Sequence, residues 1–216
     1  MNQFEKPTLA NVDGIDFIRT YYRQVIIKYE EASYYSRYPL NLFWANTNMQ
    51  EMQNIIDSAE SWADIIHGAQ RTMMFSVNVS DVEKELAVDW LLEEQRTRGL
   101  DLFSLPSEIE ESSFSYPQNN ALRQNRRLTP DFLRTVNICN NISSEVPVPT
   151  AKLQVIELGG GLGHLARTMR LSGLTRSHII IDIPETLVFS YCFLKQNFPD
   201  AKLLLVDDTT PRDSDF

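Results

Sequence analysis

Apolar side chains recur every three or four residues over most of the first two thirds of the chain, which is the spacing of amphipathic helices. Residues that can cap a helix stand where several of these patterns begin: Asp13, Ser80 with Glu83 as a capping box, and Thr129 followed by Pro130. The predicted helices run from Asp13 to Tyr29, from Thr47 to Met73, from Ser80 to Gly99 and from Thr129 to Asn141. We therefore expect this part of the chain to be helical.

Residues 100–128 show no such spacing and are rich in proline, serine and asparagine, which indicates a long connection. The end of this connection carries the basic cluster Arg123, Arg126 and Arg127. Arginine guanidinium groups bind carboxylates and phosphates through paired hydrogen bonds. The cluster is either a solvated patch beside the next helix or a contact, through Arg126 and Arg127, for an anionic group on a substrate.

The pattern changes after the proline-containing linker SSEVPVPTAK. Short apolar runs typical of strands now alternate with helical patterns, with strands at 153–158, 177–183 and 202–206 and helices at 162–171 and 185–197. Such alternation is typical of parallel strands joined by helices. The sequence thus predicts an α/β protein. A helical N-terminal region that caps or contacts the substrate, residues 1–148, precedes the first half (β-α-β-α-β) of a Rossmann-like doubly wound parallel sheet, residues 149–216.

The stretch VIELGGGLGHLARTMR joins the first predicted strand to the helix after it and holds Gly159, Gly160, Gly161 and Gly163. Glycine leaves room for a ligand to approach the backbone and permits positive φ, while the first amides of the helix favour electron-rich groups. In doubly wound sheets, ligands bind at this end of the strands. We therefore expect a cofactor site in this loop, although a tight glycine turn without a ligand explains the same residues.

Two registers of the loop fit two cofactors. Counted from Gly159 the loop follows an acid, Glu157, and has the pattern G-x-G-x-G, whereas counted from Gly161 it satisfies the G-x-G-x-x-A pattern of dinucleotide-binding proteins. Asp182 ends the second strand and can accept ribose hydroxyls in either case. A carboxylate at Glu157 would repel a pyrophosphate, but it suits the amino and sulfonium groups of S-adenosylmethionine. This cofactor is favoured, and an NAD(P)-dependent oxidoreductase is the alternative.

The stretch VIELGGGLGHLARTMR followed by HIIIDIPETLVFSYCFLKQNFPDAKLLLV resembles class I SAM-dependent methyltransferases. Through Asp182-Ile183-Pro184-Glu185 it resembles, more narrowly, the sugar O-methyltransferases, which implies a sugar or glycan hydroxyl as acceptor. The resemblance implies these cofactor contacts: Glu157 and the loop glycines Gly159, Gly160, Gly161 and Gly163 for the methionine part, Asp182 for the ribose, and Ile183 with Asp207 or Asp208 for the adenine. It assigns no catalytic residue, and His164 is interpreted as a packing or surface residue.

Composition bears on partners and compartment. The formal net charge of -9 and the pI near 4.9 argue against a surface that binds nucleic acid. No apolar stretch is long enough to span a bilayer and the first residues lack a secretory signal pattern, so we expect a cytoplasmic protein that binds no membrane. Cys139 and Cys192 lack metal-ligand spacing, so no metal site is predicted.

The predicted sheet has no fourth strand, because the sequence ends at Phe216. In the strand order of methyltransferases, Leu153–Leu158 would then be an apolar edge with unpaired backbone groups. We favour the interpretation that the chain is the N-terminal portion of a longer protein. Alternatively, the edge is covered by the helical region, by a partner or by a second copy in a homo-oligomer. A non-catalytic interaction module built on this half-sheet is a third interpretation of the function.

Overall fold

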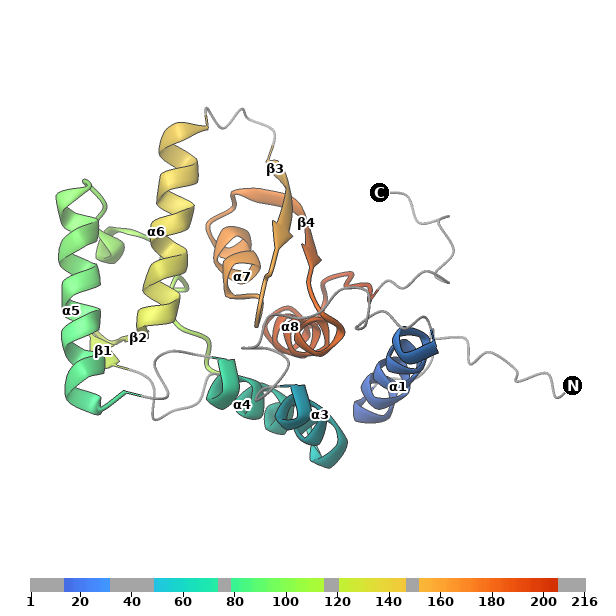
Figure 1. The fold of residues 1–216 in the computed structure, drawn as a ribbon. Coiled ribbons are helices and arrows are strands. Elements are labelled where there is room, and N and C mark those ends of the chain that lie inside the picture. Colours follow the sequence, from blue (N-terminus) through green and yellow to red (C-terminus); the bar gives the residue numbers. More distant parts are fainter. Residues whose placement is uncertain (1–13, 32–48, 74–78, 115–120, 147–151, 206–216) are drawn as a thin grey trace, which may run out of the picture.

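The computed structural model describes residues 14–31, 49–73, 79–114, 121–146 and 152–205. Over these residues the protein is a mostly helical α/β structure with seven α-helices and two small sheets (Figure 1). The helices are α1 (Ile15–Glu31), α3 (Met49–Ser58), α4 (Trp62–Met73), α5 (Asp81–Thr97), α6 (Pro130–Glu145), α7 (His164–Leu171) and α8 (Pro184–Asn197). The strands are β1 (Ala121–Arg123), β2 (Arg126–Leu128), β3 (Leu153–Leu158) and β4 (Thr175–Ile181). None of these helices is long and apolar enough to cross a membrane.

Two of the three capping residues predicted from the sequence, Ser80 and Thr129, begin helices, and the third, Asp13, lies outside the described residues. Ser80 accepts a hydrogen bond from the Glu83 amide while the Glu83 carboxylate accepts one from the Ser80 amide at 2.8 Å, so the capping box of α5 is confirmed. Thr129 caps α6, with Pro130 at its first position. Gly99 follows α5 with a φ of +78°, a left-handed conformation that glycine adopts without strain.

The apolar spacing predicts one helix over residues 47–73, but the structure has two, α3 and α4. The break covers residues 59–61, and Ser61 and Asp64 cap the start of α4. The Ser61 amide donates to the Asp64 carboxylate at 2.8 Å, and the Asp64 amide donates to the Ser61 hydroxyl at 3.3 Å. This reciprocal capping starts a new helix at a point where the apolar spacing continues without interruption.

Strands β3 and β4 form a parallel pair, and α7 lies in the connection between them. This is the strand-helix-strand unit that the sequence predicts, and α8 follows β4 as expected. The predicted third strand is absent: residues 202–205 join neither sheet, and residue 206 lies outside the described residues. Leu205 packs instead against the apolar cluster of the helices, so its burial does not require strand pairing. In the described residues the parallel sheet has two strands, so the predicted Rossmann-like doubly wound sheet is not shown there.

The connection predicted over residues 100–128 contains an antiparallel hairpin, β1 and β2. Its two-residue turn, Gln124 and Asn125, has φ values of 50° and 63°. Turns with two left-handed residues match the twist of a hairpin, but they usually contain glycine. The sequence has no glycine there, which is why its turn signal is weak.

Two apolar cores hold together the elements whose arrangement Figure 1 shows. In the first, α1, α3 and α4 pack against α8, where Phe189 and Phe193 are fully buried. In the second, α5, α6 and the hairpin surround Phe132 and Leu133, and Leu171 at the end of α7 packs against them. Each core thus contains elements from both sides of the boundary predicted at residue 148.

The two faces of the β3–β4 pair differ in exposure. Ile156, Leu158, Ile179 and Ile181 are exposed, whereas the alternate positions are half-buried. The register places Ile156 beside Ile179 and Leu158 beside Ile181, so the four side chains form one apolar patch. Parallel sheets are normally covered on both faces. The described residues cover only one face of this pair.

The Thr129 hydroxyl accepts the Phe132 amide at 3.1 Å and donates to the buried Glu111 carboxylate at 2.6 Å. Replacing Thr129 by valine keeps the shape but removes both hydrogen bonds. We expect Thr129→Val to lower the free energy of unfolding by about 1–3 kcal/mol, measured by urea denaturation. Thr97→Val, at an exposed position on α5, is the matched control and should change stability by under about 0.5 kcal/mol. Equal losses for the two variants would contradict this account of the cap.

Candidate functional site

The glycine loop joins the end of β3 to the start of α7 and spans residues 159–163. Gly159, Gly161 and Gly163 have φ values of 74°, 56° and 89°, in the left-handed region that other residues avoid. Gly163 is also the N-cap residue of α7. The left-handed residues thus alternate along the loop, in the G-x-G-x-G register counted from Gly159.

Gly160 is required for a different reason. A Cβ atom at this position would lie 2.5 Å from Ile180 Cγ2 on β4 and 3.3 Å from Glu157 Cδ. The first distance is far shorter than carbon atoms tolerate. Backbone conformation or lack of space therefore accounts for each of the loop glycines.

Asp182 follows β4 and holds the loop. Its carboxylate accepts hydrogen bonds from the Gly161 amide at 2.9 Å and from the Ile183 amide at 2.8 Å, one on each oxygen. Because a carboxylate oxygen can accept two hydrogen bonds, the contacts among the described residues leave each oxygen one acceptor site. The structure thus brings together the glycine loop and the acid that the sequence assigns to the ribose.

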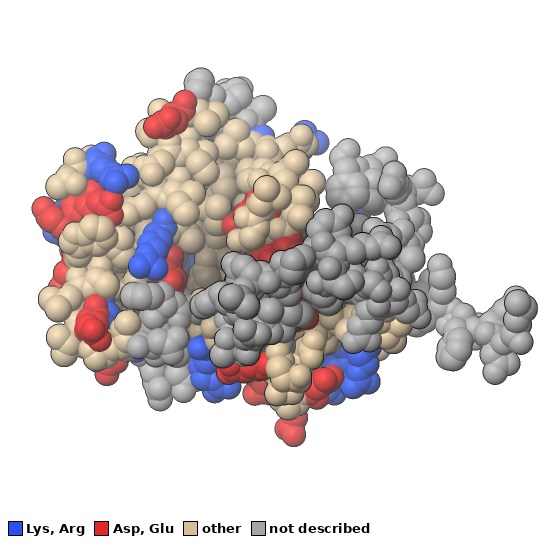
Figure 2. All heavy atoms as spheres, in the orientation of Figure 1, with Lys and Arg blue, Asp and Glu red and all other residues tan. Residues whose placement is uncertain are grey.

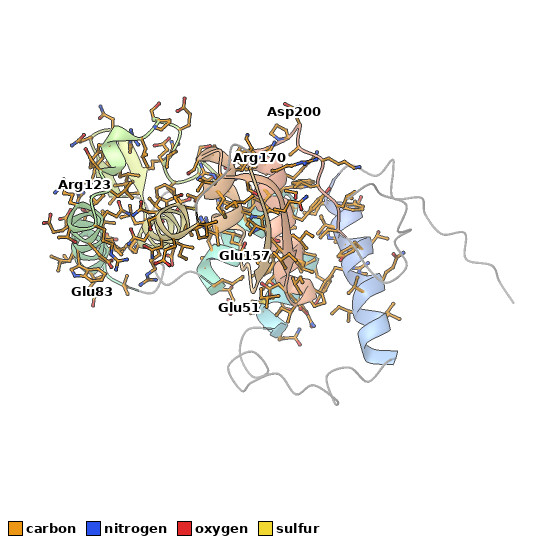
Figure 3. The ribbon with its side chains drawn as sticks, turned by 90° about the horizontal axis from the view of Figure 1, so that it is seen from above. Glu51, Glu83, Arg123, Glu157, Arg170 and Asp200 are labelled. Atoms are coloured by element: carbon orange, nitrogen blue, oxygen red, sulfur yellow. The ribbon has the colours of Figure 1, made fainter. Side chains whose placement is uncertain are left out.

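Glu157 lies beside the loop, but its carboxylate already has a partner. His178 on β4 donates through Nε2 to the Glu157 carboxylate at 2.8 Å, and both side chains are nearly buried. Cys139 of α6 is close enough for the Glu157 charge to contribute to its pKa, which burial raises to about 12. Figure 3 shows Glu157 near the centre of the molecule, far from Arg123 at the α5 edge.

Of the remaining predicted cofactor residues, the structure describes Ile183 only. Ile183 is half-buried and directly precedes α8, where its carbonyl accepts the Thr186 hydroxyl at 2.9 Å. Asp207 and Asp208 lie outside the described residues.

Arg126 and Arg127 are engaged within the chain. The Arg126 guanidinium donates to main-chain carbonyls of residues 102–109, among them Leu105 O at 2.6 Å. Arg127 forms an ion pair with Glu110 and donates to the Glu111 carbonyl at 3.3 Å. Arg126 also lines an open surface cavity of about 530 Å³, none of whose lining residues belongs to the glycine loop. The structure does not bring these arginines together with the loop.

His164 begins α7 and is buried, so of the two interpretations, a packing or a surface residue, its burial fits the first. Its ring lies 4.8 Å from the Phe193 ring, and Nδ1 lies 3.7 Å from a Glu111 carboxylate oxygen. Neither ring nitrogen has a hydrogen-bond partner among the described residues. Sequence reasoning missed the neighbouring Glu111, because no local pattern marks it.

Arg167 is a buried arginine that holds α7 in place, and no pattern in the sequence predicts it. Arg167 donates to the Asn197 side chain and to the Glu110 carbonyl, both at 2.7 Å. Burial lowers the pKa of Arg167, while the charges of the nearby glutamates raise it. These contacts tie the helix that follows the glycine loop to α8 and to the segment before the hairpin.

Glu185, in the Asp-Ile-Pro-Glu element, is fully buried at the start of α8. The Tyr22 hydroxyl of α1 donates to its Oε1 at 3.0 Å, and Gln53 of α3 also hydrogen-bonds to the carboxyl. Burial raises the pKa of Glu185, and the charge of Asp182 raises it further. The acid therefore links the N-terminal helices to the end of β4 next to the glycine loop.

The chain matches no protein-family model, and comparisons with curated proteins and with solved structures found no match either. The resemblance to methyltransferases therefore rests on the motifs alone. Among the described residues, no group of three His, Cys, Asp or Glu side chains is placed to hold a metal ion.

A double-mutant cycle tests the packing of the loop. We expect Gly160→Ala to destabilise the protein by about 1–3 kcal/mol, because the new methyl group meets Ile180. In an Ile180→Ala background the same substitution should cost much less, as measured by urea denaturation. Gly159→Ala is the matched control: its φ of 74° is strained for alanine, but nothing lies within 4 Å, so Ile180→Ala should not reduce its cost. Additive effects of Gly160→Ala and Ile180→Ala would contradict the contact.

The raised pKa of Glu185 predicts a pH dependence. The folded state binds this proton more tightly than the unfolded state, so the free energy of unfolding falls as pH rises from 4.5, the ordinary value, through the raised pKa. Glu185→Gln removes this titration. The stability of the variant relative to the wild type should therefore increase from pH 4.5 toward neutrality in urea denaturation at a series of pH values. A constant difference across that range would contradict the assignment.

Proposed function

We propose that this chain binds S-adenosylmethionine at the glycine loop and that it acts as an O-methyltransferase on a sugar or glycan hydroxyl. The observation that carries the proposal is the geometry of the loop. Every second residue of the loop between β3 and α7 is a left-handed glycine, and the Gly161 amide donates to the carboxylate of Asp182, which follows β4. Loops at this end of parallel strands are the usual ligand sites of such folds.

The register of the loop favours S-adenosylmethionine over a dinucleotide. The left-handed residues Gly159, Gly161 and Gly163 match the pattern counted from Gly159, which starts directly after β3. The Glu157 carboxylate lies against Gly160, so a pyrophosphate in the loop would meet a like charge at short range. A sulfonium and an amino group would be attracted by it.

The chain's own residues take these roles in the proposal. The free acceptor sites of Asp182 receive the ribose hydroxyls, and amides of the loop and of the start of α7 face the methionine part. Bound S-adenosylmethionine supplies the methyl group. Transfer requires an acceptor hydroxyl aligned with that methyl and a group that removes its proton. The acceptor class rests on the resemblance through Asp182-Ile183-Pro184-Glu185.

Calorimetric titration with S-adenosylhomocysteine and with NADH tests the choice of cofactor. We expect S-adenosylhomocysteine to bind and NADH not to bind. Glu157→Gln should lower the affinity for S-adenosylhomocysteine at least about fivefold, because it removes a negative charge. Glu93→Gln, on the exposed side of α5, should leave this affinity unchanged. Binding of NADH that is indifferent to Glu157→Gln would favour the oxidoreductase. A chain that binds neither compound would contradict a cofactor role for the loop.

A further inference from the structure

Helix α5 has two apolar faces. One is buried in the second core and holds Val88, Leu91 and Leu92. On the opposite side Val82, Leu86 and Trp90 are 68%, 63% and 65% exposed. These three residues are spaced by four, so they form a stripe along about two turns of the helix. We call Val82, Leu86 and Trp90 the α5 stripe.

The stripe belongs to a well-formed helix. The capping box at Ser80 and Glu83 fixes the start of α5, and Val88, Leu91 and Leu92 fix its inner face. The stripe is therefore held in one geometry. Single exposed apolar residues are common on protein surfaces, but a regular row that includes a tryptophan is typical of surfaces that bind another protein.

The residues around the stripe carry a net negative charge, which favours a partner with basic residues. The sequence of α5 carries six carboxylates and two cations. Asp89 and Glu93 lie next to the stripe on the helical repeat. Part of the negative charge is neutralised, because Arg123 of β1 pairs with Glu85 and Asp89 and Arg96 pairs with Glu93. Acidic side chains are visible along the outer edge of the molecule formed by α5 (Figure 2). The surface is apolar at its centre and acidic at its rim.

We propose that the α5 stripe is a docking surface for an amphipathic helix with a basic rim, carried by a partner protein. A stripe at positions i, i+4 and i+8 fits the apolar ridge of a second helix, and lysines or arginines flanking that ridge would meet the carboxylates of α5. Two copies of this chain would bring two acidic helices together, and an anionic membrane would repel the same rim. The proposal does not depend on the cofactor.

A pair of synthetic peptides tests this surface. Both form amphipathic helices with the same leucine stripe, which lysines flank in one and glutamates in the other. Fluorescence anisotropy of the labelled peptides against the whole protein should show binding of the lysine peptide, weakened by added salt, and at least about tenfold weaker binding of the glutamate peptide. Leu86→Ala and Trp90→Ala should each lower the affinity for the lysine peptide at least about tenfold.

Ile27→Ala is the matched control, because Ile27 is a 52% exposed apolar residue on α1, outside the stripe. It should leave the affinity unchanged, and circular dichroism should show that all three variants keep their helix content. Equal binding of both peptides, or binding that the stripe variants do not weaken, would overturn the proposal. Self-association of the protein that Trp90→Ala abolishes would overturn it in favour of a second copy.

Discussion

The hydrogen bond from the Gly161 amide to the Asp182 carboxylate is the contact on which the candidate site depends. It joins the loop after β3 to the end of β4, two points that are 21 residues apart in the chain. Gly161 can point its amide at the acid because it adopts a left-handed φ of 56°. The same carboxylate also accepts the Ile183 amide, so one side chain fixes both the loop and the approach to α8.

Contacts of α7 with α6 and α8 hold the end of this loop in place. Arg167 ties α7 to Asn197 of α8, and Thr168 of α7 lies in hydrogen-bond contact with Thr135 of α6 at 3.0 Å. Burying an arginine is costly unless its donors have partners, and here the Asn197 side chain accepts from Nε and the Glu110 carbonyl accepts from Nη1. The end of the loop is thus attached to both cores, which explains how two strands suffice to present it.

Local signals in the sequence predicted much of this arrangement. The Ser80 and Thr129 caps, the glycine loop and the strand-helix-strand order are encoded within a few residues, and each is present in the structure. The break at Ser61 and the hairpin turn at Gln124 were missed, because continuous apolar spacing hides the first and the lack of glycine hides the second. The third strand was predicted wrongly over residues 202–205, because an apolar run does not distinguish strand pairing from packing against helices.

The sequence does not predict which residues far apart in the chain contact one another. His178 lies 21 residues from Glu157, and the Glu110 carbonyl lies 57 residues from Arg167. No periodicity or motif relates such positions, since only the folded chain brings them together. The pairing with His178 also could not be predicted, and it holds the Glu157 carboxylate beside the loop.

The most direct test of the cofactor assignment is a titration of isotope-labelled protein with S-adenosylhomocysteine, followed by amide NMR shifts. The account predicts that the largest shifts fall on Gly159 to His164 and on Asp182 and Ile183, at the ends of β3 and β4. Shifts that are absent there, or that gather on elements remote from the loop such as α5, would contradict it.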